Sequence, residues 1–466
     1  MKLQLENVWT KVLESSELEL AWLDHYLSFE DKSRFFMRRK YGRGDGLLHL
    51  FDHRRGAFPS GLAEKVDIAA AEEGYAVTLD NVRVDPCPPS GGPQSLASHI
   101  ALRSPGLRDY QCIAVERALA RTRGILHLPT GAGKTRIACA LVQNATCHWL
   151  FLVHRQDLLR QTQRMYHEVT GNEAGHVGEG ELCPDTNRRF TVATFQTLAA
   201  GLRAKDKRVE HLLADVEGLI CDEAHVCAAS TFWRVAMKTR RAFYRIGLSG
   251  TPLARGDRRG IYTVGALGPV IYHLKPEALI QQGVLARPTI RVRTLVQSCK
   301  ASSWQAVYTA LVERSSARNA LVIEMTQRAR KPALVFVSRV AHGHALARWL
   351  NASGIKAEFQ WGASSSSSRE AAIKRLRFGD IDVVVCSIIW QEGVDIPEVE
   401  AVINAAGGRS TIAAIQRIGR GMRTDEGRKG TFEVWEIYDK DGGFLERHSK
   451  ERVRAYRKEG HAVQIT

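Results

Sequence analysis

Long apolar runs are absent from the sequence. No stretch of about 18 uninterrupted apolar residues occurs, so we expect no membrane-spanning helix and no association with a membrane. Residues Met1 to Glu6 also lack the apolar core of a signal peptide. These two absences predict a cytoplasmic protein.

Paired cysteines are absent as well. The chain has nine cysteines, and none of them stands in a Cys-x-x-Cys pair. This usage does not indicate a disulfide framework or a zinc site, and we interpret the cysteines as reduced thiols that are mostly buried. His225 and Cys227 have a spacing seen in metal sites, but they lie inside another motif that accounts better for His225.

Acidic residues are too few to balance the basic ones. Lys and Arg number 66 against 50 Asp and Glu, which gives a formal net charge of +16. Such an excess favours a polyanionic partner, because cations that neutralise phosphates release condensed counterions. Nucleic acid is the first candidate. The alternative is a general solubility charge, which requires no particular sign.

Two breaks in composition divide the chain into three units. Pro86 to Pro93 is rich in proline and glycine and cannot sustain a helix or a central strand. A second break lies around Ala286 to Thr289. We expect an N-terminal domain over residues 1–90, a second domain over 100–290 and a third over 300–466.

Short apolar runs alternate with helical patterns in the second and third units. This alternation predicts buried parallel strands joined by right-handed crossovers. The fold class is therefore α/β, with two tandem doubly wound parallel-sheet domains after a small α+β N-terminal domain. In such sheets, ligands bind at the carboxyl ends of the strands. The expected strands are 124–127, 149–153, 190–193, 219–221, 244–248, 333–337, 383–386, 401–404 and 432–437.

A phosphate-binding loop follows the first of these strands. Small residues before a Lys-Thr pair let successive backbone N–H groups surround a polyphosphate at a helix N-terminus. The lysine reaches the outer phosphates and the threonine hydroxyl holds Mg²⁺. Leu128 stands where the strict pattern has glycine, so the loop is a variant. The residues expected to bind ATP here are Pro129, Thr130, Gly131, Ala132, Gly133, Lys134 and Thr135.

An acidic pair follows a later strand. Asp222 and Glu223 come directly after the apolar run 218–221. At that position a carboxylate can hold Mg²⁺ and its neighbour can orient and deprotonate the attacking water. We expect Asp222 to be a metal ligand with Thr135, and Glu223 to be the catalytic base. ATP and Mg²⁺ are the expected cofactors.

These motifs resemble those of the superfamily 2 helicases of the DEAD/DEAH-box type. Asp222 to His225 reads Asp-Glu-Ala-His, and the loop reads Pro-Thr-Gly-Ala-Gly-Lys-Thr. The resemblance extends over about residues 105 to 440 and implies two RecA-like motor domains. The other matching segments are Leu107 to Gln111, Ser249 to Pro252, Glu392 to Pro397 and Gln416 to Arg423.

The resemblance assigns roles to single residues. Arg108 and Gln111 are implied to bind ATP, with the glutamine reading the adenine edge, and Gly393 and Asp395 to bind ATP from the other domain. Ser249 and Thr251 are implied to couple hydrolysis to movement. Gln416, Arg420 and Arg423 join Lys134 and Glu223 as catalytic residues, because a guanidinium offsets charge that develops on the γ-phosphate. For Arg417, a structural ion pair is an equal alternative.

Nucleic-acid contacts are expected from loops in both motor domains. Short hydroxyls, amides and backbone N–H groups suit phosphate and sugar contacts, which position a strand without reading its sequence. Each residue taken alone could be an ordinary helix cap. The candidates are His154, Arg155, Thr194, Gln196, Ser338, Arg339 and Ser387.

The N-terminal domain carries a basic cluster around Arg38, Arg39 and Lys40. Aromatic side chains among these cations are either stacking platforms or core residues. The segment resembles the N-terminal domain of the phage UvsW-type branched-DNA helicases at Tyr41-Gly42, Asp45-Gly46, Gly61-Leu62 and Gly74-Tyr75. That resemblance implies fork regression, branch migration or unwinding of displaced-strand loops, in DNA recombination and repair, inside a bacterial or phage-infected cytoplasm.

Together these features predict an ATP-dependent DNA helicase or translocase. We expect a monomer that binds branched or double-stranded DNA without regard to sequence. The alternatives are an RNA helicase, the motor subunit of a restriction-type complex, and an ATP-gated DNA clamp without catalysis. A basic C-terminal helix is also expected; its cations form a binding surface or a solvated face. They are Arg447, Lys450, Arg452, Arg454, Arg457 and Lys458.

Overall fold

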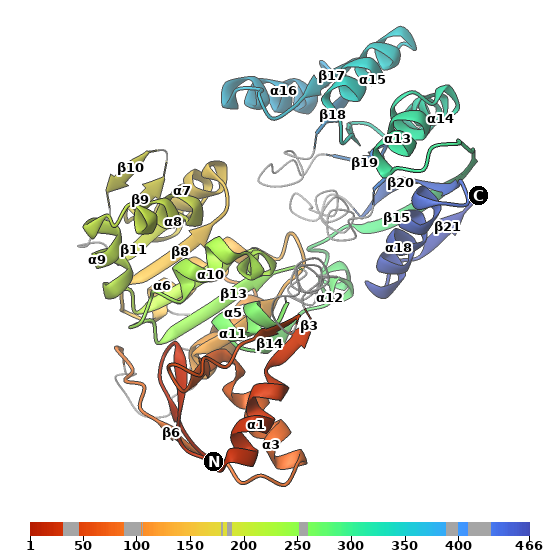
Figure 1. The fold of residues 1–466 in the computed structure, drawn as a ribbon. Coiled ribbons are helices and arrows are strands. Elements are labelled where there is room, and N and C mark those ends of the chain that lie inside the picture. Colours follow the sequence, from red (N-terminus) through yellow and green to blue (C-terminus); the bar gives the residue numbers. More distant parts are fainter. Residues whose placement is uncertain are drawn as a thin grey trace. The chain divides into compact units, whose positions relative to one another are not determined.

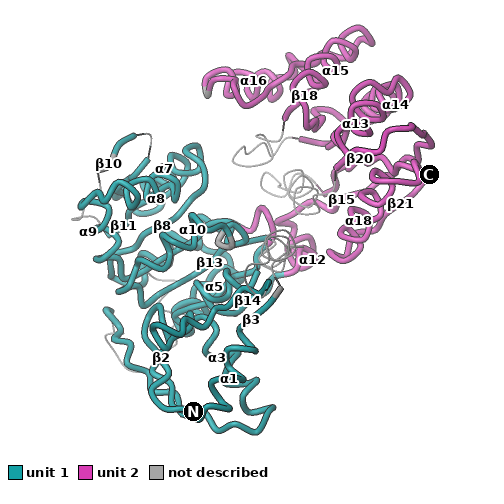
Figure 2. The backbone as a smooth tube through the Cα atoms, viewed as in Figure 1, with its two compact units in different colours: residues 1–128, 133–274 teal, residues 129–132, 275–466 magenta. Residues whose placement is uncertain are grey.

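The fold is described from a computed structural model of the chain (Figure 1). The described residues are 1–30, 46–87, 104, 106–178, 180–183, 189–250, 260–387, 399–408 and 430–466. They form two compact units, coloured separately in Figure 2. The first unit comprises residues 1–128 and 133–274, and the second comprises 129–132 and 275–466.

A small α+β layer begins the first unit. Its four-stranded sheet has the order β5-β2-β1-β6, with β1 parallel to β6 and antiparallel to β2. Helix α1 begins with a capping box in which Ser16 and Glu19 satisfy each other's backbone N–H groups. The elements are β1 (Lys2–Leu5), β2 (Trp9–Glu14), α1 (Glu17–Tyr26), β3 (Ser28–Glu30), β4 (Leu47–His49), β5 (Ala57–Pro59), η1 (Ser60–Leu62), α3 (Ala63–Glu72) and β6 (Thr78–Asn81).

This N-terminal layer packs directly on helix α11 (Gly260–Leu267). The buried side chains of Phe58 and Leu62 belong to one apolar cluster that also takes in Val264 of α11. Polar contacts add to the junction, because Arg123 donates to the carbonyl of Asn7 at 2.5 Å. Gly61 lies so close to α11 that a Cβ atom there would stand 1.9 Å from the carbonyl oxygen of Val264. The absence of a side chain at residue 61 is therefore a condition of this packing.

Substituting Gly61 by alanine is expected to destabilise the first unit by about 1–3 kcal/mol, as overpacking does in other cores. The obstacle is backbone carbonyl rather than a flexible side chain, so the N-terminal layer must shift away from α11. Urea unfolding of the full chain measures the effect. Gly430→Ala is the matched control, because a Cβ atom there meets nothing within 4 Å. Equal unfolding midpoints for both variants would contradict the described junction.

An eight-stranded sheet forms the centre of the first unit. Its order is β10-β9-β11-β8-β12-β13-β7-β14, parallel except for the antiparallel pair of β10 with β9. Strands β8, β11 and β13 are buried along their whole length, as expected for strands with helices on both faces. The strands are β7 (Arg123–His127), β8 (Trp149–Val153), β9 (Gly175–Gly178), β10 (Glu181–Cys183), β11 (Phe190–Thr194), β12 (Gly218–Asp222), β13 (Tyr244–Ser249) and β14 (Val270–His273).

Helices connect these parallel strands. The crossover after β7 is α6, and α7 and α8 follow β8 and β11. The helices, besides α11, are α5 (Asp109–Arg121), α6 (Lys134–Asn144), α7 (Gln156–Thr170), α8 (Phe195–Arg203), α9 (Lys207–Asp215), η2 (Ala224–Ala228) and α10 (Ser230–Ala236).

A second, entirely parallel sheet forms the centre of the other unit. Its order is β17-β18-β16-β19-β20-β15-β21. The strands are β15 (Arg287–Val296), β16 (Ala333–Phe336), β17 (Ala357–Gln360), β18 (Val383–Cys386), β19 (Ala401–Asn404), β20 (Thr431–Lys440) and β21 (Val463–Ile465). The helices are α12 (Pro276–Gln281), α13 (Trp304–Tyr308), η3 (Thr309–Glu313), α14 (Ser316–Arg328), α15 (Val340–Ala352), α16 (Ser366–Phe378) and α18 (Phe444–Lys458).

The predicted fold class is confirmed: two tandem RecA-like parallel-sheet domains follow a small α+β region. Each strand predicted from the sequence is present in one of the two large sheets. No helix among the described residues is long and apolar enough to cross a membrane.

One local expectation was wrong. The break expected around residues 286–289 is the start of β15, where Pro288 pairs with Phe432 of β20. Strand β21 pairs with β15 only from Ile290 to Val292, so the other edge of β15 is open at Pro288 and tolerates a residue without an N–H. Helix α16 begins at Ser366, because the Ser365 side chain accepts from the Ser368 N–H and caps the helix.

Candidate ATP and nucleic-acid site

The candidate ATP site lies where neighbouring strands of the first sheet end. In the parallel register, His127 at the end of β7 stands opposite Ser249 at the end of β13. Asp222 at the end of β12 stands opposite Leu248. The sequence placed the phosphate loop, the acidic pair and Ser249 directly at or after these ends, so the sheet brings all three to one edge.

The phosphate loop is held to the neighbouring strand through its backbone. The N–H of Leu128 donates to the carbonyl of Ser249 at 2.9 Å, and His127 Nε2 lies 2.9 Å from the carbonyl oxygen of Gly250. Gly131 and Gly133 have φ angles of 89° and 76°, a region that glycine reaches without steric cost. Helix α6 begins at Lys134, directly after the second of these turns.

Leu128, the departure from the strict loop pattern, is a core residue. Its side chain is fully buried, as is that of Ala132 within the loop. A glycine at residue 128 would remove this buried apolar surface. The leucine therefore contributes to the packing beneath the loop.

Gln111 lies directly against the phosphate loop. Its side chain is 2% exposed and its Oε1 accepts from the N–H of Arg108 at 3.0 Å. A Cβ atom on Gly133 would stand 2.4 Å from Gln111 Nε2, so the amide touches the last glycine of the loop. Gln111 thus lies beside the loop, and Arg108 is bound to Gln111 through its backbone N–H.

The acidic pair faces the lysine of the loop. Lys134 Nζ lies 3.7 Å from Oε1 of Glu223, and both side chains are mostly buried, at 13% and 17% exposure. Glu223 has a left-handed backbone with φ of 48°, which is uncommon outside glycine and turns this side chain out of the strand direction. The Nδ1 atom of His225 lies 3.3 Å from Glu223 Oε2 and 3.3 Å from the hydroxyl of Ser249.

The two carboxylates differ in their affinity for protons. Burial raises the pKa of Asp222, and the adjacent charge of Glu223 raises it further. Burial also acts to raise the pKa of Glu223, but the positive charge of Lys134 and the hydrogen bond from His225 outweigh it and hold this pKa below its usual range. Glu223 is thereby kept as a carboxylate that can accept a hydrogen bond from water.

The buried carboxylate of Asp222 offers an oxygen that suits a magnesium ion. The Oδ1 atom of Asp222 is buried and has no hydrogen-bond partner among the described residues. A buried carboxylate oxygen without a partner is costly, and a hard cation satisfies it. Thr135 is the second residue of α6 and is partly buried. Within the described chain, no cluster of three or more His, Cys, Asp or Glu could bind a metal by itself.

The four nucleic-acid candidates of the first unit follow two neighbouring strands. Strands β8 and β11 are paired so that Val153 stands opposite Thr194. Gln196 donates from Nε2 to the carbonyl of His154 at 2.9 Å, which joins the two loops that follow these strands. Thr194 Oγ1 lies 2.7 Å from the hydroxyl of Thr197. Arg155 is the residue before α7, at the same strand end.

The candidates of the second unit also follow adjacent strands. Ser338 and Arg339 lie between β16 and α15, and Ser387 follows β18. Ser387 is mostly buried and its N–H donates to the carbonyl of Gln360 at 3.1 Å. Arg339 has its Nε 3.5 Å from Glu313 and its guanidinium over the ring of Tyr308.

Several assigned residues fall outside the described part of the chain. Their expected roles therefore stay predictions. They are Thr251, Gly393, Asp395, Gln416, Arg420 and Arg423 of the ATP site, and Arg38, Arg39 and Lys40 of the N-terminal cluster.

Sequence reasoning missed several supporting side chains. His225 was part of the acidic motif but had no assigned role, although it contacts both Glu223 and Ser249. Tyr308 and Glu313 around Arg339 had no sequence signal, since they reach that residue only through the fold.

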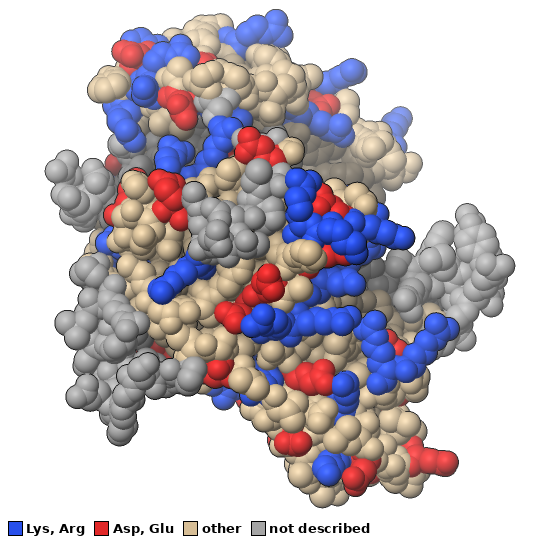
Figure 3. Space-filling view, turned by 90° about the vertical axis from the view of Figure 1, so that its left-hand side faces the viewer, with Lys and Arg blue, Asp and Glu red and all other residues tan. Residues whose placement is uncertain are grey.

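Positive charge is widely distributed on the surface. On the face drawn in Figure 3, Lys and Arg lie in several groups with Asp and Glu between them. The net charge of +16 therefore does not gather into one basic patch on the described part of this face.

Comparisons with known proteins agree with this geometry. The family model "Type III restriction enzyme, res subunit" matches residues 104–254, and "Helicase conserved C-terminal domain" matches 316–425. A relative named "Putative DNA 3'-5' helicase Rad25", from Halobacterium salinarum, is 29% identical over 81% of this chain and 60% of its own length. The "ATP-dependent DNA helicase uvsW" of Enterobacteria phage T4 is 23% identical over 93% of this chain and 92% of its own length.

Solved structures share the fold. The T4 UvsW crystal structure has a TM-score of 0.50 at 20% identity and covers 100% of this chain and 99% of its own. An HsdR subunit fragment of a type I restriction enzyme from Vibrio vulnificus YJ016 has a TM-score of 0.60 at 20% identity, covering 80% and 70%. The chain spans between 60% and 66% of the length of the first three curated relatives it matches. With its motifs in order and both helicase domains matched, the chain belongs to the superfamily 2 helicases, and it is similar to UvsW.

Proposed function

We propose that the protein is an ATP-driven DNA helicase or translocase that remodels branched or duplex DNA. The observation that carries the proposal is the placement of Lys134 opposite Glu223, beside the unpartnered carboxylate oxygen of Asp222. A cation for the phosphates, a base for water and an oxygen for a metal are the parts that phosphoryl transfer requires. The substrates proposed are replication forks, junctions and R-loops or D-loops.

Each residue has one task in this proposal. Lys134 leaves Glu223 and binds the β- and γ-phosphates, while backbone N–H groups of residues 129–133 surround the polyphosphate. Glu223 accepts a proton from the attacking water. Thr135 and Asp222 hold Mg²⁺, which neutralises phosphate charge when bound. Gln416, Arg420 and Arg423 supply the charges at the γ-phosphate, and Gly393 and Asp395 contact the nucleotide.

In this proposal, the loops that follow the strands couple ATP hydrolysis to DNA binding. His225 bridges Glu223 and Ser249, and Ser249 precedes Thr251 in the coupling segment. The loops with His154, Gln196 and Arg339 bind the backbone of one strand without reading its bases. We further propose that the N-terminal region and the two parallel-sheet regions act as three domains, and that the protein acts as a monomer.

A restriction-type motor is the second candidate. The family model over residues 104–254 carries the name of a restriction enzyme subunit, and an HsdR fragment shares the fold. Such a motor would act only within a larger assembly. An RNA helicase and a non-catalytic clamp are the remaining alternatives.

The proposal is tested by ATPase assays with matched DNA and RNA forks. Stimulation by DNA forks well above that by RNA forks is the expected result. A clear preference for RNA would remove the branched-DNA proposal, and failure of any nucleic acid to stimulate phosphate release would leave only the clamp.

Replacing Gln111 by alanine is expected to raise the KM for ATP about tenfold, which corresponds to the loss of one or two hydrogen bonds to the adenine. The KM for GTP should change little, because the proposed contact reads only the adenine edge. Steady-state kinetics with both nucleotides measure the effect, with exposed Gln282→Ala as the control. Equal increases for ATP and GTP would show that Gln111 supports the loop without reading the base.

A further inference from the structure

The outer face of α18 carries a stripe of cations. Each member has another member three or four residues away, so all of them lie on one side of the helix. All of them are exposed, while Arg452 of the same helix is 1% exposed. The outer stripe consists of Arg447, Lys450, Arg454, Arg457 and Lys458.

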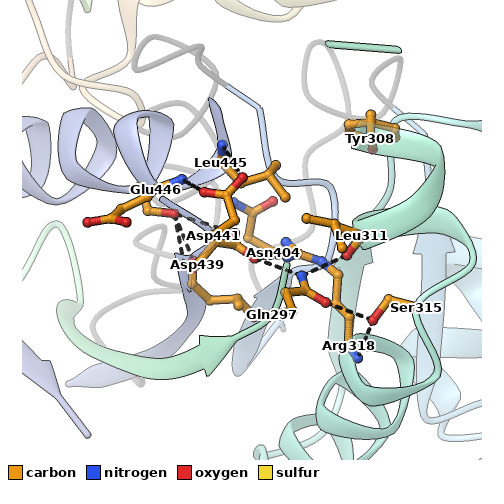
Figure 4. Close-up of polar contacts among 12 residues, drawn as sticks. Gln297, Tyr308, Leu311, Ser315, Arg318, Asn404, Asp439, Asp441, Leu445 and Glu446 are labelled. Atoms are coloured by element: carbon orange, nitrogen blue, oxygen red, sulfur yellow. Dashed lines mark hydrogen bonds and ion pairs between the residues drawn. The ribbon is translucent and has the colours of Figure 1, made fainter. Parts of the chain in front are cut away.

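The inner face fixes this helix to the sheet. Arg452 donates to the carbonyl of Gly408 at 2.5 Å and to Glu436 at 3.2 Å, which corrects its expected place among the surface cations. At the start of the helix, Asp441 accepts from the N–H groups of Leu445 and Glu446 at 3.3 and 2.8 Å (Figure 4). The stripe therefore projects from a helix that is anchored at its start and along its buried side.

The dimensions of the stripe suit a phosphate backbone. From Arg447 to Arg457 the helix rises about 15 Å at roughly 1.5 Å per residue. One strand of duplex DNA presents about four phosphates over that length, at roughly 3.4 Å of axial rise each. Glu446 and Glu451 stand at the two borders of the stripe, and Glu446 pairs with Lys450 at 2.7 Å. Around the helix axis, the positions of α18 that lie between these two glutamates on the outer face are all basic.

Helix stability alone does not explain the stripe. Lys450 and Arg454, and Arg454 and Lys458, are like charges four residues apart, an arrangement that destabilises a helix. Arg457 and Lys458 lie in the last turn, where the helix dipole favours cations. Arg447 lies near the start, where the dipole disfavours them. A binding role accounts for the cations that the helix itself does not favour.

We propose that the outer face of α18 binds the phosphate backbone of double-stranded DNA, at a surface separate from the strand-end loops. The inference rests on the proposed function, because it assumes a DNA substrate. Surfaces for single strands combine cations with exposed aromatic side chains that stack on bases. Among the exposed large apolar side chains, none lies between Phe444 and Lys458. The stripe thus holds a duplex by charge and reads no sequence.

The test uses the full chain and a short blunt DNA duplex. Binding is measured by fluorescence anisotropy at several salt concentrations, without nucleotide. The Arg454→Gln/Arg457→Gln variant is expected to lower the slope of log affinity against log salt by about 1 to 2, at roughly 0.9 for each phosphate that the variant no longer neutralises. The control is Lys238→Gln/Arg240→Gln, which removes the same charge from exposed residues before β13 and should keep the slope. Thermal unfolding midpoints confirm that both variants fold.

The outcomes separate this proposal from the proposed function. If the unaltered protein does not bind the duplex, the DNA-remodelling function is wrong. If it binds and the α18 variant keeps its slope, or changes no more than the control, the α18 surface is overturned while the function stands. If the α18 variant lost binding to phosphatidylserine vesicles but kept its salt slope for the duplex, the proposed DNA surface would also be overturned. The partner of α18 would then be an anionic membrane.

Discussion

Replacing Glu223 by glutamine is expected to lower the rate of ATP hydrolysis by about 10²- to 10⁴-fold, the usual contribution of a general base. Glutamine keeps the size of the side chain but cannot take a proton from water. It also removes the negative partner of Lys134, so that the lysine is free for phosphates. Phosphate release measures turnover, and a fluorescent ATP analogue measures nucleotide affinity, which should be kept or increased.

The control for this variant is Glu168→Gln, an exposed glutamate on α7. It changes the net charge by the same amount and should not alter turnover. If Glu223→Gln kept more than about a tenth of the activity, Glu223 would not be the base. If it also lost nucleotide binding, the side chain would be needed for the shape of the site.

Replacing Arg318 by methionine is expected to destabilise the second unit by about 3–5 kcal/mol, because it leaves a buried charge without its partner. Arg318 and Asp439 are both fully buried, with Nη1 and Oδ1 2.5 Å apart (Figure 4). Within the part of the chain that the structure describes, the other side chains that donate to Asp439 are the neutral Gln297 and Ser449. Urea unfolding of the full chain, followed by tryptophan fluorescence, measures the loss.

The paired replacement Arg318→Met/Asp439→Leu is the matched control. Removing both charges leaves no unpaired ion, so most of the stability should return, as happens when buried ion pairs are replaced by apolar side chains. If the double variant were as unstable as Arg318→Met, the loss of stability would come from the packing of the arginine side chain and not from the unpaired charge of Asp439.

The motor part of the fold was predictable from local patterns. The runs at 149–153 and 383–386 are apolar throughout and bounded by helical patterns, which identifies buried parallel strands. The loop with Lys134 and the acidic pair were recognised in the same way, because each motif is contiguous in sequence and follows a strand.

Contacts between distant residues were not predictable. Arg318 and Asp439 are 121 residues apart, and no sequence pattern at either residue indicates its partner. The packing of Gly61 on α11 likewise joins residues that are far apart in the sequence. In the basic helix, periodicity could have separated Arg452 from its neighbours, since its position falls on the side of Leu445 and Tyr456.

The most direct test of the proposed function is strand exchange on synthetic DNA. Purified protein is mixed with a labelled fork and a labelled four-way junction, and products are separated on native gels with and without ATP. We predict ATP-dependent conversion of both substrates by the unaltered protein and none by Glu223→Gln. Vigorous DNA-stimulated ATP hydrolysis without any rearranged product would contradict the account.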